Sequence, residues 1–182
     1  MKIILIGGQA QHGKDTSAEM LKDIFKRDNK KVLIVRYGDY LKFVCKHYFG
    51  WDGIKDDHGR TVLQIYGTEK GRDRNPGIWA KVLFEFMKAF GEDFDYVIIP
   101  DFRYPDESNI WVGSEYDSFS LWVHRKDFDN GLTEEQKNHR SETSLLYFSF
   151  DYSISVESKP YKLREALERM LMSKGFKRFN NK

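Results

Sequence analysis

The feature that most constrains this chain is a buried apolar run that leads directly into a glycine-containing loop. Ile3 to Ile6 are all apolar, and the loop "GGQAQHGKDT" follows from Gly7 to Thr16. A continuous apolar run is typical of a strand that is covered on both faces of a parallel sheet. Apolar residues then recur at helical spacing, which predicts a helix from about Lys14 to Asp28. This order favours an α/β fold with the loop at the carboxyl edge of the sheet.

The rest of the chain alternates between strand and helix patterns. Asn75 is the expected N-cap of a helix that has Pro76 in its first turn and Gly91 at its end. A last helix is expected to open at Ser158 and Pro160 and to end near residue 175, with a frayed, solvated basic tail after it. Four further strands are expected at Val32–Val35, Tyr96–Ile99, Ser120–Val123 and Tyr152–Val156.

The loop after the first strand has the spacing of a phosphate-binding loop. Gly8, Gly13 and Lys14 fit the pattern G-x-x-x-x-G-K, in which backbone N–H groups surround phosphate and the lysine reaches its terminal oxygens. The helix that starts at Lys14 directs the positive end of its dipole at the same anion. The sequence therefore predicts phosphate binding at this loop.

Asp15 departs from the pattern, which asks for a hydroxyl at this position, and Thr16 supplies one a residue later. Mg²⁺ accepts a carboxylate as readily as a hydroxyl, so Asp15 is a candidate metal ligand. The alternative is that Asp15 points outward and only stabilises the first turn of the helix, where negative charge is favourable. The sequence leaves both interpretations open.

The chain of 182 residues is expected to form a single domain. Two segments do not fit a simple alternation of strands and helices, because residues 37–75 are too long for one crossover and residues 125–142 are polar and interrupted by glycine. We interpret residues 37–75 as an acceptor-binding insertion and residues 125–142 as a mobile lid.

Charge and cysteine content exclude several classes of protein. Thirty basic and 28 acidic residues give a net charge of +2, which argues against a nucleic-acid or membrane-surface protein. The single cysteine, Cys45, excludes an intrachain disulfide, and the first apolar run is too short for a signal peptide or membrane span. We expect a cytoplasmic protein, and the sequence leaves its oligomeric state open, a homodimer included.

Four motifs in order give the chain a likeness to a known family. "GQAQHGKDT", "LQIYGTEKGRD", "IIPDFRYPDE" and "HRSETSL" together resemble the phage-type deoxynucleoside monophosphate kinases, a branch of the P-loop nucleoside monophosphate kinase superfamily. The resemblance implies a three-layer sandwich with a five-stranded parallel sheet. It also implies ATP and Mg²⁺ as cosubstrates, and transfer of the γ-phosphate to a nucleoside monophosphate to give the diphosphate.

Residue roles follow from the resemblance together with the chemistry of each side chain. Phosphoryl transfer needs fixed positive charge around the transferred group, so Lys14, Arg103 and Arg140 are the candidate catalytic residues. Asp15 and Asp101 are the candidate metal ligands. Candidate ATP-binding residues are Gly8, Gln11, His12, Gly13, Lys14, Asp15, Thr16 and Arg125, and candidate acceptor-binding residues are Gln64, Thr68, Arg72, Trp79, Asp101 and Arg103.

Several of these residues have a plainer interpretation. In the plainer interpretation of Asp101, its carboxylate caps a turn instead of holding metal. In that of Arg103, its guanidinium forms an ion pair with Asp106 or Glu107 instead of contacting a phosphate. Arg72 is the expected clamp for an acceptor phosphate, with a solvated helix face as the alternative. Trp79 lies on an apolar helix stripe, which favours a core position over a base-stacking pocket. His139 is expected to brace the lid, not to act as a base.

The activity also has open alternatives. One alternative is a kinase of the same fold that acts on a phosphorylated small metabolite instead of a nucleotide. Such a kinase would not need aromatic rings for base stacking. A regulatory module would bind ATP without efficient transfer, for which the Asp15 substitution is the main support. The accepted base, the sugar and the preferred phosphate donor are not determined by the sequence.

Overall fold

Five strands form one sheet in which every neighbouring pair is parallel, in the order β2-β3-β1-β4-β5. The structure is a computed structural model and describes residues 1–54 and 56–181. The five-stranded parallel sheet expected from the sequence is confirmed. The strands are β1 (Lys2–Gly7), β2 (Val32–Ile34), β3 (Tyr96–Phe102), β4 (Asp117–Arg125) and β5 (Tyr152–Val156).

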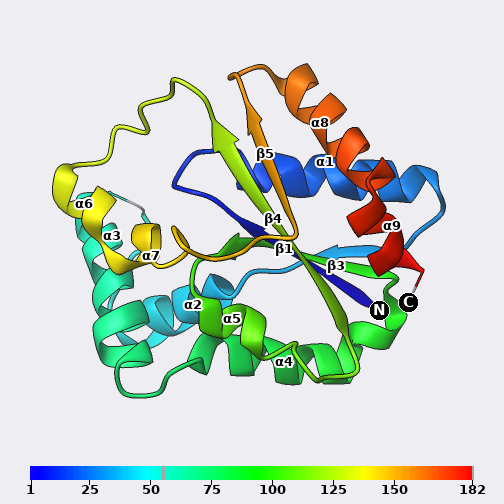
Figure 1. The fold of residues 1–182 in the computed structure, drawn as a ribbon. Coiled ribbons are helices and arrows are strands. Elements are labelled where there is room, and N and C mark those ends of the chain that lie inside the picture. The colour runs from blue at the N-terminus through cyan, green and yellow to red at the C-terminus, as the bar shows by residue number, and fades with distance from the viewer. Residues whose placement is uncertain (55, 182) are drawn as a thin grey trace.

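Helices connect the strands and cover both faces of the sheet (Figure 1). Within the described residues, the α-helices are α1 (Lys14–Arg27), α2 (Gly38–Tyr48), α3 (Asp57–Gln64), α4 (Ile78–Phe90), α5 (Pro105–Asn109), α6 (Glu134–Asn138), α7 (Arg140–Thr143), α8 (Pro160–Met172) and α9 (Lys174–Asn180). A π-helical segment, η1 (Ile65–Arg72), continues directly from α3, and a 3₁₀ turn, η2 (Gly91–Asp93), follows α4.

Two hydrophobic cores lie on opposite faces of the sheet. On one face, α1, α8 and α9 contribute buried side chains such as Leu21, Leu167 and Phe176. On the other face, α4 and the turn after α5 contribute Leu83 and Trp111. Burying a side chain of this size stabilises the fold by about 1.5–3 kcal/mol. The apolar runs of the central strands therefore serve both cores at once, which explains why they show no alternation.

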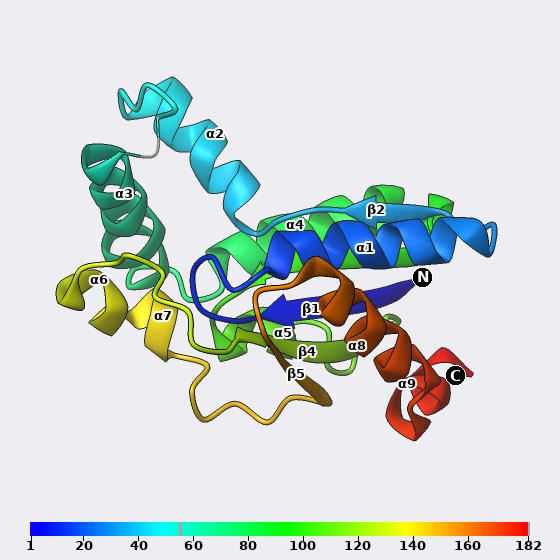
Figure 2. The ribbon, with the colours of Figure 1, turned by 90° about the horizontal axis from the view of Figure 1, so that it is seen from above.

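The parallel strands bring their carboxyl ends to one edge of the sheet. Figure 2 shows that β1 points toward the end of the molecule where α2, α3, α6 and α7 gather. α2 and α3 belong to residues 37–75, and α6 and most of α7 belong to residues 125–142, the two segments that do not fit the strand–helix alternation. The fold thus places both segments beside the loop that follows β1.

Three local expectations are corrected by the structure. The basic tail is not frayed: it forms α9 and buries Phe176 and Phe179. The helix expected at Asn75 begins at Ile78, because Gly77 adopts a left-handed conformation (φ 74°) and ends the preceding turn. The strand expected at Tyr96–Ile99 continues to Phe102, and Pro100 lies in it at a register shift against β1, where no ladder N–H is required.

None of the described helices is both long enough and apolar enough to cross a bilayer.

Candidate active site

The loop between β1 and α1 is shaped by glycines at Gly8 and Gly13. Gly8 has φ of +150°, and a Cβ atom there would lie 2.4 Å from the carbonyl oxygen of Val123 in β4. Gly13 has φ of +95°, and α1 begins at the next residue. Only glycine combines this backbone conformation with such close approach to a neighbouring strand. The two glycines therefore allow the loop to turn close beneath β4 at the carboxyl end of β1.

Lys14 is the first residue of α1, and its side chain reaches back to the loop. Its Nζ donates to the carbonyl oxygens of Gly8 and Gln9, both at 2.7 Å. Burial, with a smaller contribution from the nearby Arg103 guanidinium, lowers the pKa of Lys14 to about 7. The lysine still lines a cavity of about 620 Å³, a size typical of small-molecule sites. An anion in this cavity would raise the pKa of Lys14 and favour its charged form.

The first turn of α1 supplies Asp15 at the rim of the same cavity. Arg36 donates from Nε and Nη2 to one carboxylate oxygen of Asp15, at 3.2 and 2.6 Å. The Asp15 side chain is 70% exposed, so both its metal-binding and its outward-pointing interpretations remain predictions. Thr16 is exposed.

Asp101 in β3 reaches the cavity from its floor. Its two carboxylate oxygens accept the backbone N–H groups of Tyr37 (3.0 Å) and Gly38 (2.9 Å), where α2 begins. Burial raises the pKa of Asp101, and the two N–H groups oppose this shift. Asp101 therefore anchors the start of the insertion while its carboxylate also faces the cavity.

The chemistry of these two carboxylates fits a Mg²⁺ ion held mainly by phosphate and water. No described group of three or more acidic, histidine or cysteine side chains is arranged to hold a metal alone. Mg²⁺ in phosphoryl-transfer sites commonly uses one or two carboxylates together with substrate oxygens. Asp15 and Asp101 both line the cavity, which makes such a pair available here.

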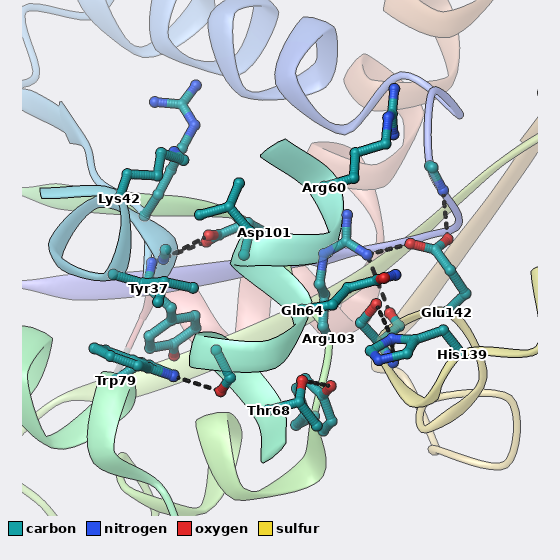
Figure 3. A pocket seen from close by; sticks show the side chains of 18 of the residues that line it. Tyr37, Lys42, Arg60, Gln64, Thr68, Trp79, Asp101, Arg103, His139 and Glu142 are labelled. Carbon is teal, nitrogen blue, oxygen red and sulfur yellow. Dashed lines mark hydrogen bonds and ion pairs between the residues drawn. The ribbon is translucent and has the colours of Figure 1, made fainter. Parts of the chain in front are cut away.

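The insertion forms one wall of the cavity (Figure 3). Gln64, Thr68, Arg72 and Trp79, all expected to bind the acceptor, line it. Trp79 is 6% exposed and donates its Nε1–H to the carbonyl of Gly67 at 2.8 Å. Trp79 is therefore buried and also borders the cavity, and its role in base stacking stays a prediction.

Arg72 is held by acidic partners on the segment after β3. It donates to Asp106 (3.2 Å) and to the buried carboxylate of Glu107, and its guanidinium lies 3.9 Å from the centre of the Tyr104 ring. Glu107 also accepts the backbone N–H groups of Arg103 (2.7 Å) and Tyr104 (3.2 Å). Burial raises the pKa of Glu107 to about 7, and Arg72 opposes that shift. Arg72 thus joins η1 to α5.

Arg60 was missed in the sequence and lines the cavity from α3. No carboxylate among the described residues forms an ion pair with it, so its charge is open to an anion in the cavity. Arg60 stands one helical turn before Gln64, and residues four apart share a helix face. That spacing is the signal that could have identified Arg60 once Gln64 was chosen.

Residues 125–142, interpreted from the sequence as a lid, contribute Leu132, Gln136, His139, Ser141 and Glu142 to the lining of the cavity. Arg103 does not pair with Asp106 or Glu107 through its side chain. Its guanidinium donates to Glu142 and, at 3.1 Å, to the carbonyl oxygen of Ser141. Glu142 was also missed in the sequence, although it lies in the motif "HRSETSL".

His139 and Arg140 have structural contacts in the lid. His139 accepts the backbone N–H of Ser141 at 3.2 Å and so caps α7, which agrees with a bracing role. Burial lowers the pKa of His139, and Arg140 lowers it further. Arg140 is 58% exposed and pairs with Asp73 at 2.6 Å. It is not among the described residues that line the cavity, so its catalytic role stays a prediction.

His12 and Arg125 hold the outer side of the loop. The His12 ring accepts the backbone N–H of Arg125 at 3.0 Å, and the Arg125 guanidinium donates to the carbonyl oxygen of Gln11 at 3.1 Å. The same guanidinium lies 3.6 Å from the centre of the Phe128 ring. Gln11 lines the cavity, whereas His12 and Arg125 are not among its described lining residues. These two residues connect the loop to the end of β4.

Comparisons with known proteins add two solved structures. Both are of the APS kinase CysC of Mycobacterium tuberculosis, one a cysteine-to-alanine mutant and one in complex with AMPPNP and APS. The mutant is 9% identical with a TM-score of 0.48, covering 94% of this chain and 97% of its own. The complex is 9% identical with a TM-score of 0.49, covering 94% and 98%. No family model matches the sequence, and no curated protein matches it.

Proposed function

We propose that this protein is an ATP-dependent kinase that transfers the γ-phosphate of ATP to a phosphorylated small molecule, with deoxynucleoside monophosphates as the first candidate acceptors. One observation carries the proposal. A single cavity is lined both by the phosphate-binding loop, through Lys14, and by the insertion, through Arg60 and Gln64. A kinase needs its donor and acceptor phosphates to meet in one enclosed space.

The donor side uses the loop, Lys14 and the start of α1. Backbone N–H groups and the helix dipole would bind the ATP phosphates, and Lys14 would exchange its two carbonyl partners for phosphate oxygens. Mg²⁺, when bound, would neutralise charge between the phosphates, with Asp15 and Asp101 as the residues available to hold it or its waters. These groups would direct the γ-phosphate toward the cavity.

The acceptor side uses the cations of the insertion. Arg60 has no acidic partner among the described residues, and Lys42 lines the cavity beside Asp101. An acceptor phosphate carries nearly two negative charges, which a guanidinium binds through two parallel hydrogen bonds. Arg72 acts indirectly: it holds η1 in place, and with it Gln64 and Thr68.

The reaction needs no general base when the acceptor is a phosphate. An oxygen of the acceptor phosphate, already ionised near neutral pH, forms the new bond to the γ-phosphorus as the bond to the β–γ bridging oxygen breaks. ADP leaves with the electron pair of that bond. Positive charge from Lys14 and Arg103 stabilises the negative charge spread over the transferred group. Catalysis is by positioning and charge neutralisation.

A kinase of a different phosphorylated metabolite is the second candidate, and one observation favours it. The aromatic rings next to the acceptor wall already have partners: Trp79 is buried and bonded to Gly67, and Tyr104 is covered by Arg72. A nucleotide base normally stacks on a free ring, whereas a phosphorylated sugar or similar metabolite does not need one.

An acceptor panel tests the proposal and separates the two candidates. The protein is incubated with ATP, Mg²⁺ and either the common deoxy- and ribonucleoside monophosphates or phosphorylated sugars and other phosphorylated metabolites, and the products are separated. Lys14→Ala is expected to abolish product formation, with Lys22→Ala, a half-buried lysine of the same helix away from the cavity, as the matched control. Absence of product from every acceptor would refute the proposed activity.

A further inference from the structure

Glu142 reaches from the lid into the phosphate-binding loop. Its Oε2 atom accepts the backbone N–H of Ala10 at 2.8 Å, across 132 residues of sequence. Its Oε1 atom accepts the guanidinium of Arg103, which also donates to the carbonyl of Ser141. The Glu142 side chain is only 8% exposed, so it is enclosed by these contacts (Figure 3).

The partners of Glu142 are those that a phosphoryl group requires. A backbone N–H of a phosphate-binding loop and an arginine at the end of β3 together offer hydrogen bonds and positive charge to a small anion. A carboxylate has the same sign of charge and similar acceptor oxygens. Glu142 and a phosphoryl oxygen cannot both accept these hydrogen bonds at short distance, because two anions at that separation repel each other.

We propose that the Ala10 N–H and Arg103 form a phosphoryl subsite, that Glu142 is its internal ligand, and that a phosphate group must displace Glu142 in order to bind. The proposal rests on the proposed function, in which the loop binds a polyphosphate. It assigns to Glu142 a role that the resemblance does not supply. It also means that binding of phosphate at this subsite moves α7, and that the position of α7 affects how tightly phosphate binds.

The construction of α7 is consistent with such a displacement. α7 has four residues, its cap is the His139 side chain, and its Arg140 is joined to Asp73 by an exposed ion pair. Exposed pairs of this kind contribute little stability. The enclosed contacts of Glu142 with Ala10 and Arg103 are therefore the main polar attachment of α7 to the loop, and their loss would release it.

Titration with inorganic tripolyphosphate, in the absence of metal and acceptor, tests the competition by calorimetry. Glu142→Gln keeps the shape of the side chain but removes its charge. If Glu142 occupies the subsite most of the time, removing the competing charge strengthens binding by about tenfold, since apparent affinity scales with the fraction of open sites. Glu135→Gln, on an exposed glutamate of α6, is the matched control and is expected to leave the affinity unchanged.

The outcomes separate this proposal from the proposed function. Equal affinities of wild type and Glu142→Gln would overturn the role of Glu142 while leaving the loop as a phosphate site. Absence of tripolyphosphate binding to either protein would overturn both.

Hydrogen exchange on the wild-type protein gives a second test that does not depend on a variant. Tripolyphosphate is expected to slow exchange at the loop amides and to speed exchange in residues 139–143, because α7 loses its attachment to the loop. Unchanged or slower exchange in residues 139–143 on saturation with tripolyphosphate would contradict the displacement.

Discussion

Arg72 and Glu107 form an ion pair in the wall of the cavity, with side chains 11% and 1% exposed. The pair joins the last turn of η1 to α5 and to the backbone after β3. The residue that the sequence favours as the acceptor clamp is therefore bound to a buried carboxylate. Arg72 therefore differs from Arg60: Arg72 holds the wall of the cavity in place, whereas Arg60, with no acidic partner among the described residues, is open to a ligand.

Arg72→Ala is expected to cost stability first. It leaves the Glu107 carboxylate buried without its cation, and breaking a buried pair in this way typically costs about 3–5 kcal/mol. Urea denaturation of wild type and variant measures the difference, with Arg74→Ala, an exposed arginine two residues along, as the control. A loss no larger than that of the control would contradict the assignment of Arg72 to a positioning role.

Arg60→Ala is expected to have the opposite profile. Its guanidinium has no acidic partner among the described residues, so its removal should change the free energy of unfolding by less than about 0.5 kcal/mol. The KM for the acceptor should rise roughly tenfold or more, as expected for a lost hydrogen bond to a charged group, while the KM for ATP changes little. Arg169→Ala, on α8 away from the cavity, is the control. Equal effects on both KM values would remove Arg60 from the acceptor site.

Asp15 can be tested by its metal dependence. If its carboxylate holds Mg²⁺ directly or through water, Asp15→Ser should retain substantial activity and Asp15→Ala should be partly rescued by higher Mg²⁺. The exposed pair with Arg36 contributes little stability, so neither change should affect folding strongly. The measurement is kcat/KM across a Mg²⁺ titration for wild type and both variants. Three coincident titration curves would show that Asp15 only supports the helix start.

Because of His12, the folded protein is expected to become less stable in mild acid. Burial, with a smaller contribution from His124, lowers its pKa from 6.5 to about 4. Between these values the unfolded chain binds more protons than the folded protein, so stability falls as pH falls, by about 1.4 kcal/mol per unit. Its stabilising contribution is fully present above pH 6.5.

The matched variant for this effect is His12→Gln, which can still accept the N–H of Arg125 but does not titrate. Free energies of unfolding at several pH values from 7.5 to about 4 are compared, and the variant's curve should be shallower than that of wild type. Parallel curves would mean that His12 is protonated as readily in the folded protein as in the unfolded chain.

Sequence patterns identified the central fold because they record burial directly. β1 and β3 are continuous apolar runs, and their buried centres were located without knowledge of their neighbours. The start of α4 was misplaced because the left-handed conformation of Gly77 depends on the turn before it. Helix α9 was missed, although Phe176 and Phe179 stand at helical spacing, because the charged residues around them suggested a solvent-exposed tail.

The site was less predictable because its contacts join distant segments. The loop and Lys14 follow from local spacing, but the pairing of Arg72 with Glu107 spans 35 residues and that of Ala10 with Glu142 spans 132. No local pattern reports such partners. Arg60 could have been chosen by its helical spacing from Gln64, but its position on the cavity and its lack of an acidic partner among the described residues come from the structure.

The most direct test of the central claim follows the γ-phosphate itself. ATP labelled at the γ-phosphorus is incubated with Mg²⁺, the protein and the best acceptor from the panel, and the labelled products are separated. The account predicts that the label appears on the phosphorylated acceptor in equal amount to the ADP formed, and that Lys14→Ala stops transfer while remaining folded. Label that stays in ATP, or that appears only as inorganic phosphate, would contradict a kinase.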